Sequence, residues 1–222
     1  MSEFVDYSTD GPPLSDDLLS TGIEVLDRKL GGGIPPGRII ALTAKPASQS
    51  ELFLYEMAAV RDTVYLTTER TISDVETSLS DNDIDLSAIT IHSLHSDDSV
   101  SDAYEVLDEL GEESMLIIDP VDPLEVRAAD EYRTFLNAVK TRLRDTESLG
   151  LIHCLDGGTD ADQRSRTEYL ADVIFELRTR HRGGSTENSL FVPKFRGGAA
   201  RTEAIALDLS TNVTIDVSRK IA

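Results

Sequence analysis

Apolar residues along this chain fall into short continuous runs that alternate with segments of helical periodicity. A strand buried on both faces is a continuous apolar run, whereas an amphipathic helix has apolar residues every three or four positions. The alternation therefore predicts strand–helix–strand units and a mostly parallel sheet covered by helices. The predicted strands are 38–43, 63–67, 89–92, 114–119 and 150–155, and the predicted helices are about 50–60, 72–80, 99–110, 129–147 and 163–171.

The pattern changes after Asp172, where apolar runs follow one another without helical segments between them. These runs predict closing strands with at least some antiparallel pairing. Ahead of the first strand, 20–30 predicts a short amphipathic helix with a capping hydroxyl at its start and Gly31 at its end. We expect a polar leader at 1–19 and a single α/β domain over 20–222. The late strands are predicted at 173–180, 189–195, 203–209 and 212–217.

The chain is strongly acidic. Its 41 acidic and 21 basic side chains give a formal net charge of −20. This balance is typical of a high-salt cytoplasm, where the Debye length falls to about 3 Å at 1 M ionic strength and self-repulsion is screened. Acidity argues against nucleic acid in ordinary salt, but that argument weakens in molar salt. The chain has no signal-peptide pattern and no apolar stretch near ~18 residues, so we expect a cytoplasmic protein with no membrane partner.

The connection between strand 38–43 and the next helix is where an α/β fold would carry a nucleotide-binding loop. A loop of the form G-x-x-x-x-G-K-[ST] binds phosphates through backbone N–H groups exposed by its glycines, a lysine that neutralises charge and a hydroxyl that holds Mg²⁺. None of these residues is present, and a carboxylate lies where the helix N-terminus would attract an anion. Lys45 lies too early in the loop and is predicted to point to solvent. The four defining positions hold Ala44, Gln49, Ser50 and Glu51.

Segment 20–37 reads Ser-Thr-Gly-Ile-x-x-Leu-Asp-x-x-Leu-Gly-Gly-Gly-Ile-Pro-Pro-Gly. It resembles the lead-in to the nucleotide site of the RecA-like ATPases, in the branch that contains KaiC, GvpD and RadA. In the same order, 64–69 resembles the second strand, whose terminal Glu polarises the attacking water, and 115–119 resembles the Walker B strand. Segment 191–197 resembles the late strand whose Lys-x-Arg pair reaches the neighbouring subunit's nucleotide in KaiC-type rings. The resemblance, over residue 20 to about 217, implies a RecA-like P-loop NTPase fold.

The resemblance leaves two acidic positions and one basic pair to interpret. Glu69 corresponds to the general base and Asp119 to the Mg²⁺ ligand of active members. Because the phosphate-binding residues are missing, we interpret both as vestigial: Glu69 could pair with Arg70, and Asp119 could accept backbone hydrogen bonds. Lys194 and Arg196 are the pair that we expect to keep a role.

Basic residues are concentrated between Glu176 and Arg201, where the only acidic residues are Glu176 and Glu187. In so acidic a chain this local reversal of charge favours contact with an anion or an acidic partner, such as another subunit. It is equally compatible with two solvated strand ends that form internal ion pairs. The candidate contact residues are Arg178, Arg180, Arg182, Lys194, Arg196 and Arg201.

Other candidate residues have simpler structural interpretations. Cys154 lies in the apolar run 151–155 and is predicted to be a buried thiol. Phe135 and Ala138 match a short recombinase docking motif, but their place in an amphipathic helix predicts core residues. No motif supports Ser-His-Asp catalysis, and metal-binding spacing is missing among the histidines, which are His92, His95, His153 and His181.

These observations predict a RecA-like domain that has lost ATP hydrolysis and binds no nucleotide or metal cofactor. We expect it to act as a regulatory or scaffolding protein through contacts with itself or with another RecA-like protein. Two alternatives stay open. One is an active ATPase whose atypical loop uses Lys45, Glu69 and Asp119, and the other is a DNA recombination or repair accessory factor that uses the basic residues.

Overall fold

The computed structural model of the chain describes residues 18–94, 100–157, 161–182, 185–198, 201–210 and 212–215. Residues 1–17 of the predicted leader lie outside the described residues. So do His95 and the last two positions of the predicted strand 212–217.

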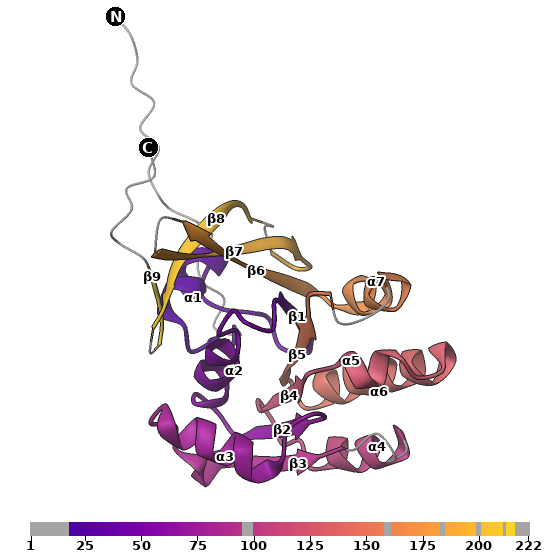
Figure 1. The fold of residues 1–222 in the computed structure, drawn as a ribbon. Helices are drawn as coiled ribbons and strands as arrows, with labels where there is room; N and C mark the ends of the chain where they lie inside the picture. Colours follow the sequence, from indigo (N-terminus) through magenta and orange to yellow (C-terminus); the bar gives the residue numbers. More distant parts are fainter. Residues whose placement is uncertain are drawn as a thin grey trace, which may run out of the picture.

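A nine-stranded sheet runs through the described residues, in the order β3-β2-β4-β5-β1-β6-β7-β8-β9 (Figure 1). The pairs from β3 across to β6 are parallel, and β7, β8 and β9 each pair with their neighbour in antiparallel direction. The predicted mostly parallel sheet with antiparallel C-terminal strands is therefore confirmed. The strands are β1 Arg38–Ala44, β2 Thr63–Thr67, β3 Ile89–Ser93, β4 Met115–Asp119, β5 Leu149–Leu155, β6 Val173–Arg182, β7 Ser185–Phe195, β8 Arg201–Leu209 and β9 Val213–Ile215.

Helices cover the two faces of the sheet (Figure 1). One face packs against α1 (Glu24–Leu30), α2 (Glu51–Ala58) and α3 (Ile72–Asp81). The other packs against α4 (Val100–Asp108), α5 (Asp122–Glu125), α6 (Ala129–Asp145) and α7 (Ala161–Leu170). The short α5 and a 3₁₀ turn at Leu86–Ala88 were not among the predicted helices. No helix within the described ranges is long and apolar enough to cross a membrane.

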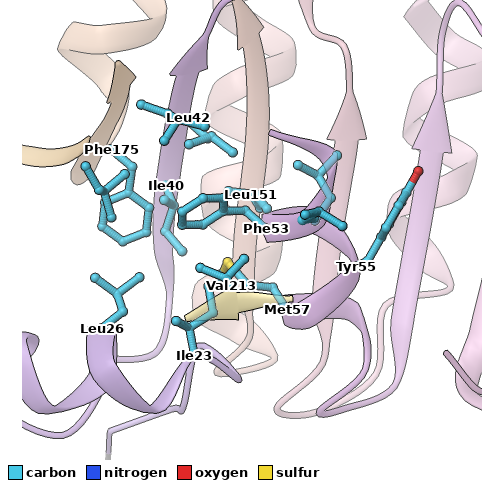
Figure 2. Close-up of a cluster of buried hydrophobic side chains, with 14 of the residues drawn as sticks. Ile23, Leu26, Ile40, Leu42, Phe53, Tyr55, Met57, Leu151, Phe175 and Val213 are labelled. Carbon is cyan, nitrogen blue, oxygen red and sulfur yellow. The ribbon is translucent and has the colours of Figure 1, made fainter. Parts of the chain in front are cut away.

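Alternation along β1 divides the core between the two faces. Ile40 and Leu42 belong to the cluster that contains Phe53 of α2 (Figure 2), whereas Ile39 belongs to the cluster on the other face. Successive side chains of a strand point to opposite faces, so one apolar run supplies both clusters. Phe135 is fully buried in the second cluster, with Ala138 packed against it, which confirms their assignment to the core.

The lead-in segment holds α1 in place through Asp27. The Asp27 carboxylate accepts hydrogen bonds from the hydroxyls of Ser20, at 2.6 Å, and Thr21, at 2.7 Å. The residue at the N-cap is Ile23, which makes no side-chain cap, so the predicted capping hydroxyl is wrong. The two hydroxyls instead donate to Asp27, which lies one helical turn after the N-cap. Gly31 ends α1 in the left-handed conformation, as predicted.

Two glycines of the same segment are required by close packing. Gly22 has φ +80°, and a Cβ there would lie 2.4 Å from the carbonyl oxygen of Glu56. Gly33 has φ +139°, and a Cβ there would lie 2.4 Å from the carbonyl oxygen of Leu19. Contacts within the fold therefore account for these two positions of the lead-in without a nucleotide.

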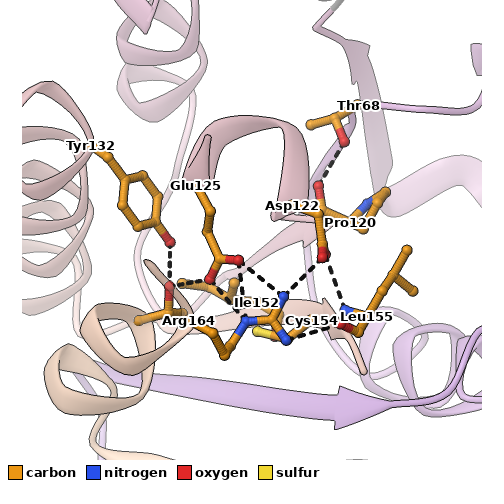
Figure 3. Close-up of polar contacts among 10 residues, drawn as sticks. Thr68, Pro120, Asp122, Glu125, Tyr132, Ile152, Cys154, Leu155 and Arg164 are labelled. Carbon is orange, nitrogen blue, oxygen red and sulfur yellow. Dashed lines mark hydrogen bonds and ion pairs between the residues drawn. The ribbon is translucent and has the colours of Figure 1, made fainter. Parts of the chain in front are cut away.

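A buried polar network joins α5, α7 and the end of β5 (Figure 3). Glu125 is fully buried and accepts hydrogen bonds from Arg164, at 2.9 to 3.2 Å. Arg164 also donates to Asp122, at 2.9 Å, and to the carbonyl oxygen of Leu155, at 3.1 Å. The Thr167 hydroxyl donates to Glu125. These donors offset the cost of burying the Glu125 carboxylate. The loss of any one of them would therefore destabilise the fold.

We expect Arg164→Ala to lower the free energy of unfolding by about 3–5 kcal/mol, because it leaves the Glu125 carboxylate buried without its cation. Denaturant titration of both proteins measures the difference. Arg178→Ala is the matched control: Arg178 pairs with Glu176 at 2.7 Å, but its side chain is 54% exposed. That change should cost less than about 1 kcal/mol. Equal losses in the two variants would contradict the assignment.

Candidate functional site

The loop between β1 and α2 lies at the carboxyl edge of the parallel strands, where open α/β sheets usually bind ligands. Gln49 has φ +55°, a left-handed conformation that favours glycine. The backbone at this position thus has a conformation suited to the glycine of a phosphate loop, although the residue is not glycine. Lys45 is exposed at the start of the loop, as predicted.

A chain of buried hydrogen bonds lies directly beneath this loop. Ser50 Oγ is 2.9 Å from Nε2 of His153, and Nδ1 of His153 is 2.6 Å from Oδ1 of Asp119. The hydroxyl of Tyr65 donates to Oδ2 of Asp119 at 2.5 Å. The four side chains come from the start of α2 and from β5, β4 and β2, and all four residues are buried. Side chains of the protein itself therefore fill the floor of this edge of the sheet.

Asp119 is the acid in this chain of hydrogen bonds. Burial opposes ionisation of Asp119, but the hydrogen bond and charge of His153 and the Tyr65 hydroxyl outweigh it and lower the pKa of the carboxyl. Burial and the neighbouring Asp119 raise the pKa of Tyr65 well above its usual value, so Tyr65 stays a donor. Asp119 is thus an ionised carboxylate with a donor on each oxygen. The predicted alternative for Asp119, acceptance of backbone hydrogen bonds, is wrong for these contacts, which come from side chains.

A cleft of about 350 Å³ opens above this floor. Glu51, Glu69 and Arg70 line it together with Asp119 and His153. The side chains of Glu51 and Glu69 form no hydrogen bond or ion pair with other residues that the structure describes. Arg70 does not pair with Glu69, contrary to the expectation, because it donates to the Tyr55 hydroxyl at 3.1 Å and to the Asp74 carbonyl at 2.8 Å.

The basic residues near the C-terminus divide between two parts of the sheet. Lys194 is paired with Ile174 near the start of β6, whereas Arg178 lies four residues further along that strand. That separation is about 13 Å at ~3.3 Å per residue. Arg178 pairs with Glu176 and stacks on the ring of Phe191, and Arg180 lies opposite Glu187. The side chains of Arg182 and Arg201 lie outside the described residues.

Lys194 and Arg196 lie at the amino edge of the parallel strands, at the opposite end of β1 from the loop. Lys194 donates to the carbonyl oxygens of Glu168, at 2.6 Å, and Tyr169, at 3.0 Å, where α7 ends. Burial and the charge of Arg196 lower the pKa of Lys194. Arg196 donates to the same Tyr169 carbonyl at 2.9 Å and approaches Asp172 at 3.4 Å. Both cations thus cap α7, while 42% of the Arg196 side chain stays exposed.

Sequence reasoning missed His153 and Tyr65. No motif links them to Ser50 and Asp119, because the four residues are far apart in the chain and come together through the strand order. The one local signal was a histidine inside the apolar run of β5, since a buried histidine needs a polar partner. The sequence contains no motif for a Ser-His-Asp arrangement, but the fold brings Ser50, His153 and Asp119 together.

A comparison with solved structures identifies the fold. The structure is similar to the crystal structure of a KaiC-like protein from the hyperthermophilic archaeon Pyrococcus horikoshii, with a TM-score of 0.73 and 17% sequence identity. The match covers 89% of this chain and 98% of that one. At this identity the likeness concerns the fold alone, which is the expected RecA-like, KaiC-like α/β fold.

A family model, described as a family of unknown function (DUF7125), matches residues 18–222. This chain belongs to that family. A comparison with curated proteins finds no significant match.

We expect Gln49→Gly to raise the free energy of unfolding by about 0.5–1 kcal/mol, because glycine adopts φ +55° without the cost that a Cβ imposes. Thermal and denaturant unfolding measure the change. Gln49→Ala is the matched control, since it shortens the side chain and keeps the Cβ, and it should bring no gain. Stabilisation of the same size in both variants would show that backbone strain is not the cause.

Asp119 should make the stability of the protein depend on pH in acid. Its pKa is lowered in the folded state, so its contribution is complete above the unfolded value of about 3.9 and is lost as the pH falls through the folded-state pKa. Asp119→Asn should therefore cost about 3 kcal/mol near neutral pH and less in strong acid. Unfolding measured across acidic pH tests this. Asp130→Asn, at an exposed residue, is the control, and a constant cost of Asp119→Asn at every pH would contradict the assignment.

Proposed function

We propose that this chain is a RecA-like pseudo-ATPase that acts as a regulatory or scaffolding protein through protein contacts. The observation that carries the proposal is the buried chain from Ser50 through His153 to Asp119. It joins the position of the phosphate-binding lysine to the position of the Mg²⁺-binding carboxylate. In an active loop both groups must be free to meet a nucleotide and its metal.

The residues present do not fit a Mg²⁺–triphosphate. Both oxygens of Asp119 already accept short hydrogen bonds, and Glu51 occupies the position of the Mg²⁺-binding hydroxyl. Glu51 and Glu69 would also face the phosphates with negative charge from within the cleft. Lys45 is exposed at the start of the loop, and Arg70 already donates to other residues. These residues therefore do not support hydrolysis of a nucleotide at this site.

Protein contact is supported by the basic pair near the end of α7. Lys194 and Arg196 cap the helix, yet part of Arg196 remains available to a partner. A second RecA-like protein or a second copy of this chain would bring acidic surface to these cations. Nucleic acid is not favoured, because the chain carries a net charge of −20 and Arg178 is engaged by Glu176 and Phe191. The acidic composition supports a high-salt cytoplasm as the setting.

The test is equilibrium binding of a fluorescent ATP analogue with Mg²⁺ in molar KCl, with an active P-loop ATPase as the positive control. We expect no binding at micromolar concentrations of this chain, because the loop supplies no cation and presents a carboxylate. Micromolar affinity would overturn the proposal and favour an active ATPase with an atypical loop.

A matched variant tests the cause. Ala44→Gly, Gln49→Gly, Ser50→Lys and Glu51→Thr together write the phosphate-loop sequence into the chain. This variant should bind the analogue at least about tenfold more tightly than the original chain, equivalent to ~1.4 kcal/mol. Equal, weak binding by both proteins, with the variant folded, would mean that the loop residues are not what excludes the nucleotide.

A further inference from the structure

A groove outside the nucleotide-type site lies between the start of α6 and the end of α7, which are neighbours in the fold (Figure 1). Its volume is about 530 Å³, and Ala129, Tyr169 and Leu170 give it a mainly apolar lining. Tyr169 is 74% exposed, which is unusual for an aromatic side chain of this size. We call this surface the tyrosine groove. An exposed aromatic ring beside an apolar hollow is typical of surfaces that bind a protein segment.

Basic side chains surround the tyrosine groove. The Lys194 ammonium and the Arg196 guanidinium lie 6.0 and 5.9 Å from the centre of the tyrosine ring. Arg166, which also lines the groove, is exposed and forms no hydrogen bond or ion pair within the described part of the chain. Arg133 and Asp130 offset each other in an exposed ion pair. A segment that carries both carboxylates and an aromatic ring would therefore be complementary to this surface.

Residues 1–17 of the leader have that composition. They include five acidic residues and no basic one. They also include Phe4 and Tyr7, which are the only Phe or Tyr residues outside the described part of the chain. The C-terminal segment 216–222, which lies outside it as well, has two basic residues, one acidic residue and no aromatic ring. Charge and aromatic content together therefore distinguish the leader as the complementary segment.

The described chain begins close to the tyrosine groove. Leu19 and Ile34 exchange two backbone hydrogen bonds of 2.9 Å. Pro35 follows Ile34, and its Cγ would lie 3.8 Å from a Cβ at Gly197, the residue after Arg196. Each of these contacts spans a few ångströms, whereas residues 1–17 can extend up to ~56 Å. The tether also gives the leader an effective concentration on the order of millimolar at the groove of its own chain.

We propose that residues 1–17 of this chain dock onto the tyrosine groove of the same molecule. The aromatic rings of the leader pack beside Tyr169, and its carboxylates face Arg166 and Arg196. In molar salt the Debye length is about 3 Å, so the aromatic contact carries more of the binding there. The inference goes beyond the proposed function. A docked leader covers the exposed part of Arg196, so it competes with any partner protein for that cation.

Fluorescence quenching in the full chain tests the docking. The chain contains no tryptophan, so Phe4→Trp places a single indole in the leader. Acrylamide carries no charge and quenches an indole that solvent reaches. We expect a Stern–Volmer quenching constant well below that of a synthetic peptide of residues 1–17 with the same substitution. A constant equal to that of the peptide overturns the proposal.

A second substitution locates the contact. Tyr169→Ala, added to Phe4→Trp, should raise the quenching constant at least about twofold, because the loss of a central aromatic contact releases the leader. Ile72→Ala is the matched control, since Ile72 is 39% exposed and lies outside the groove, at the start of α3. It should leave the constant unchanged. Equal constants with and without Tyr169→Ala, in variants that keep the unfolding transition of the original chain, overturn the proposal.

A charge reversal tests the carboxylates of the leader. Arg166→Glu, added to Phe4→Trp, should raise the quenching constant at low salt, and the increase should shrink towards 1 M KCl, where the Debye length is about 3 Å. Arg178→Glu is the matched control, because it makes the same change of charge at an exposed residue of β6 outside the groove. An equal effect of the two reversals would mean that net charge, and not the groove, is responsible.

Protein concentration separates docking within one molecule from docking between two. Protection of the indole should stay constant over about a hundredfold range of concentration, because the tether is intramolecular. Protection that grows with concentration overturns the proposal and assigns the groove to the leader of a second copy. The measurement involves no nucleotide, so its outcome is independent of the test with the ATP analogue.

Discussion

The structure depends on the hydrogen bonds that stabilise the buried negative charge of Asp119. Asp119 lies at the end of β4, an interior strand of the sheet, and is buried, so an ionised group without partners would be very costly there. His153 and Tyr65 supply a donor to each oxygen, and Ser50 extends the chain of hydrogen bonds to the start of α2. The strand ends and the helix are thereby joined without a cation from the loop. The loop's one lysine, Lys45, lies exposed at its start and takes no part in this chain of hydrogen bonds.

Two other buried carboxylates perform the same role elsewhere. Glu125 joins α5 to α7 through Arg164, and Asp172 joins β1 to α6 because it accepts the Ile39 amide and the Lys140 ammonium. Burial acts to raise the pKa of Asp172. The effects of Lys140, the Ile39 amide and Arg38 together are larger and opposite, so the pKa lies below its usual value. Each of these acids sits between elements distant in sequence. In this acidic chain a few carboxylates are thus buried, each with hydrogen-bond donors, and most of the other acidic side chains are exposed to solvent.

The two edges of the parallel sheet carry opposite chemistry. The carboxyl edge presents Glu51 and Glu69, whose side chains have no partner among the described residues, and the amino edge presents Lys194 and Arg196 against the end of α7. Acidic side chains therefore lie at one edge of the parallel sheet and basic side chains at the other. The basic stretch that looks continuous in sequence is divided by this arrangement, because β6 and β7 run in opposite directions.

The sequence by itself determined the order and type of the main elements. Strand 63–67 has the predicted bounds, and the predicted strand 38–43 differs from β1 by one residue, because an apolar run between turn residues is a local signal. The loop composition at Ala44, Gln49, Ser50 and Glu51 was likewise visible without coordinates. Only the tertiary structure decided what fills the floor beneath that loop. His153 lies 103 residues from Ser50 and 34 from Asp119, and only the placement of β5 between β4 and β1 brings their side chains within hydrogen-bond distance. Local periodicity carries no information about such a contact, because it depends on which strands become neighbours and in which register.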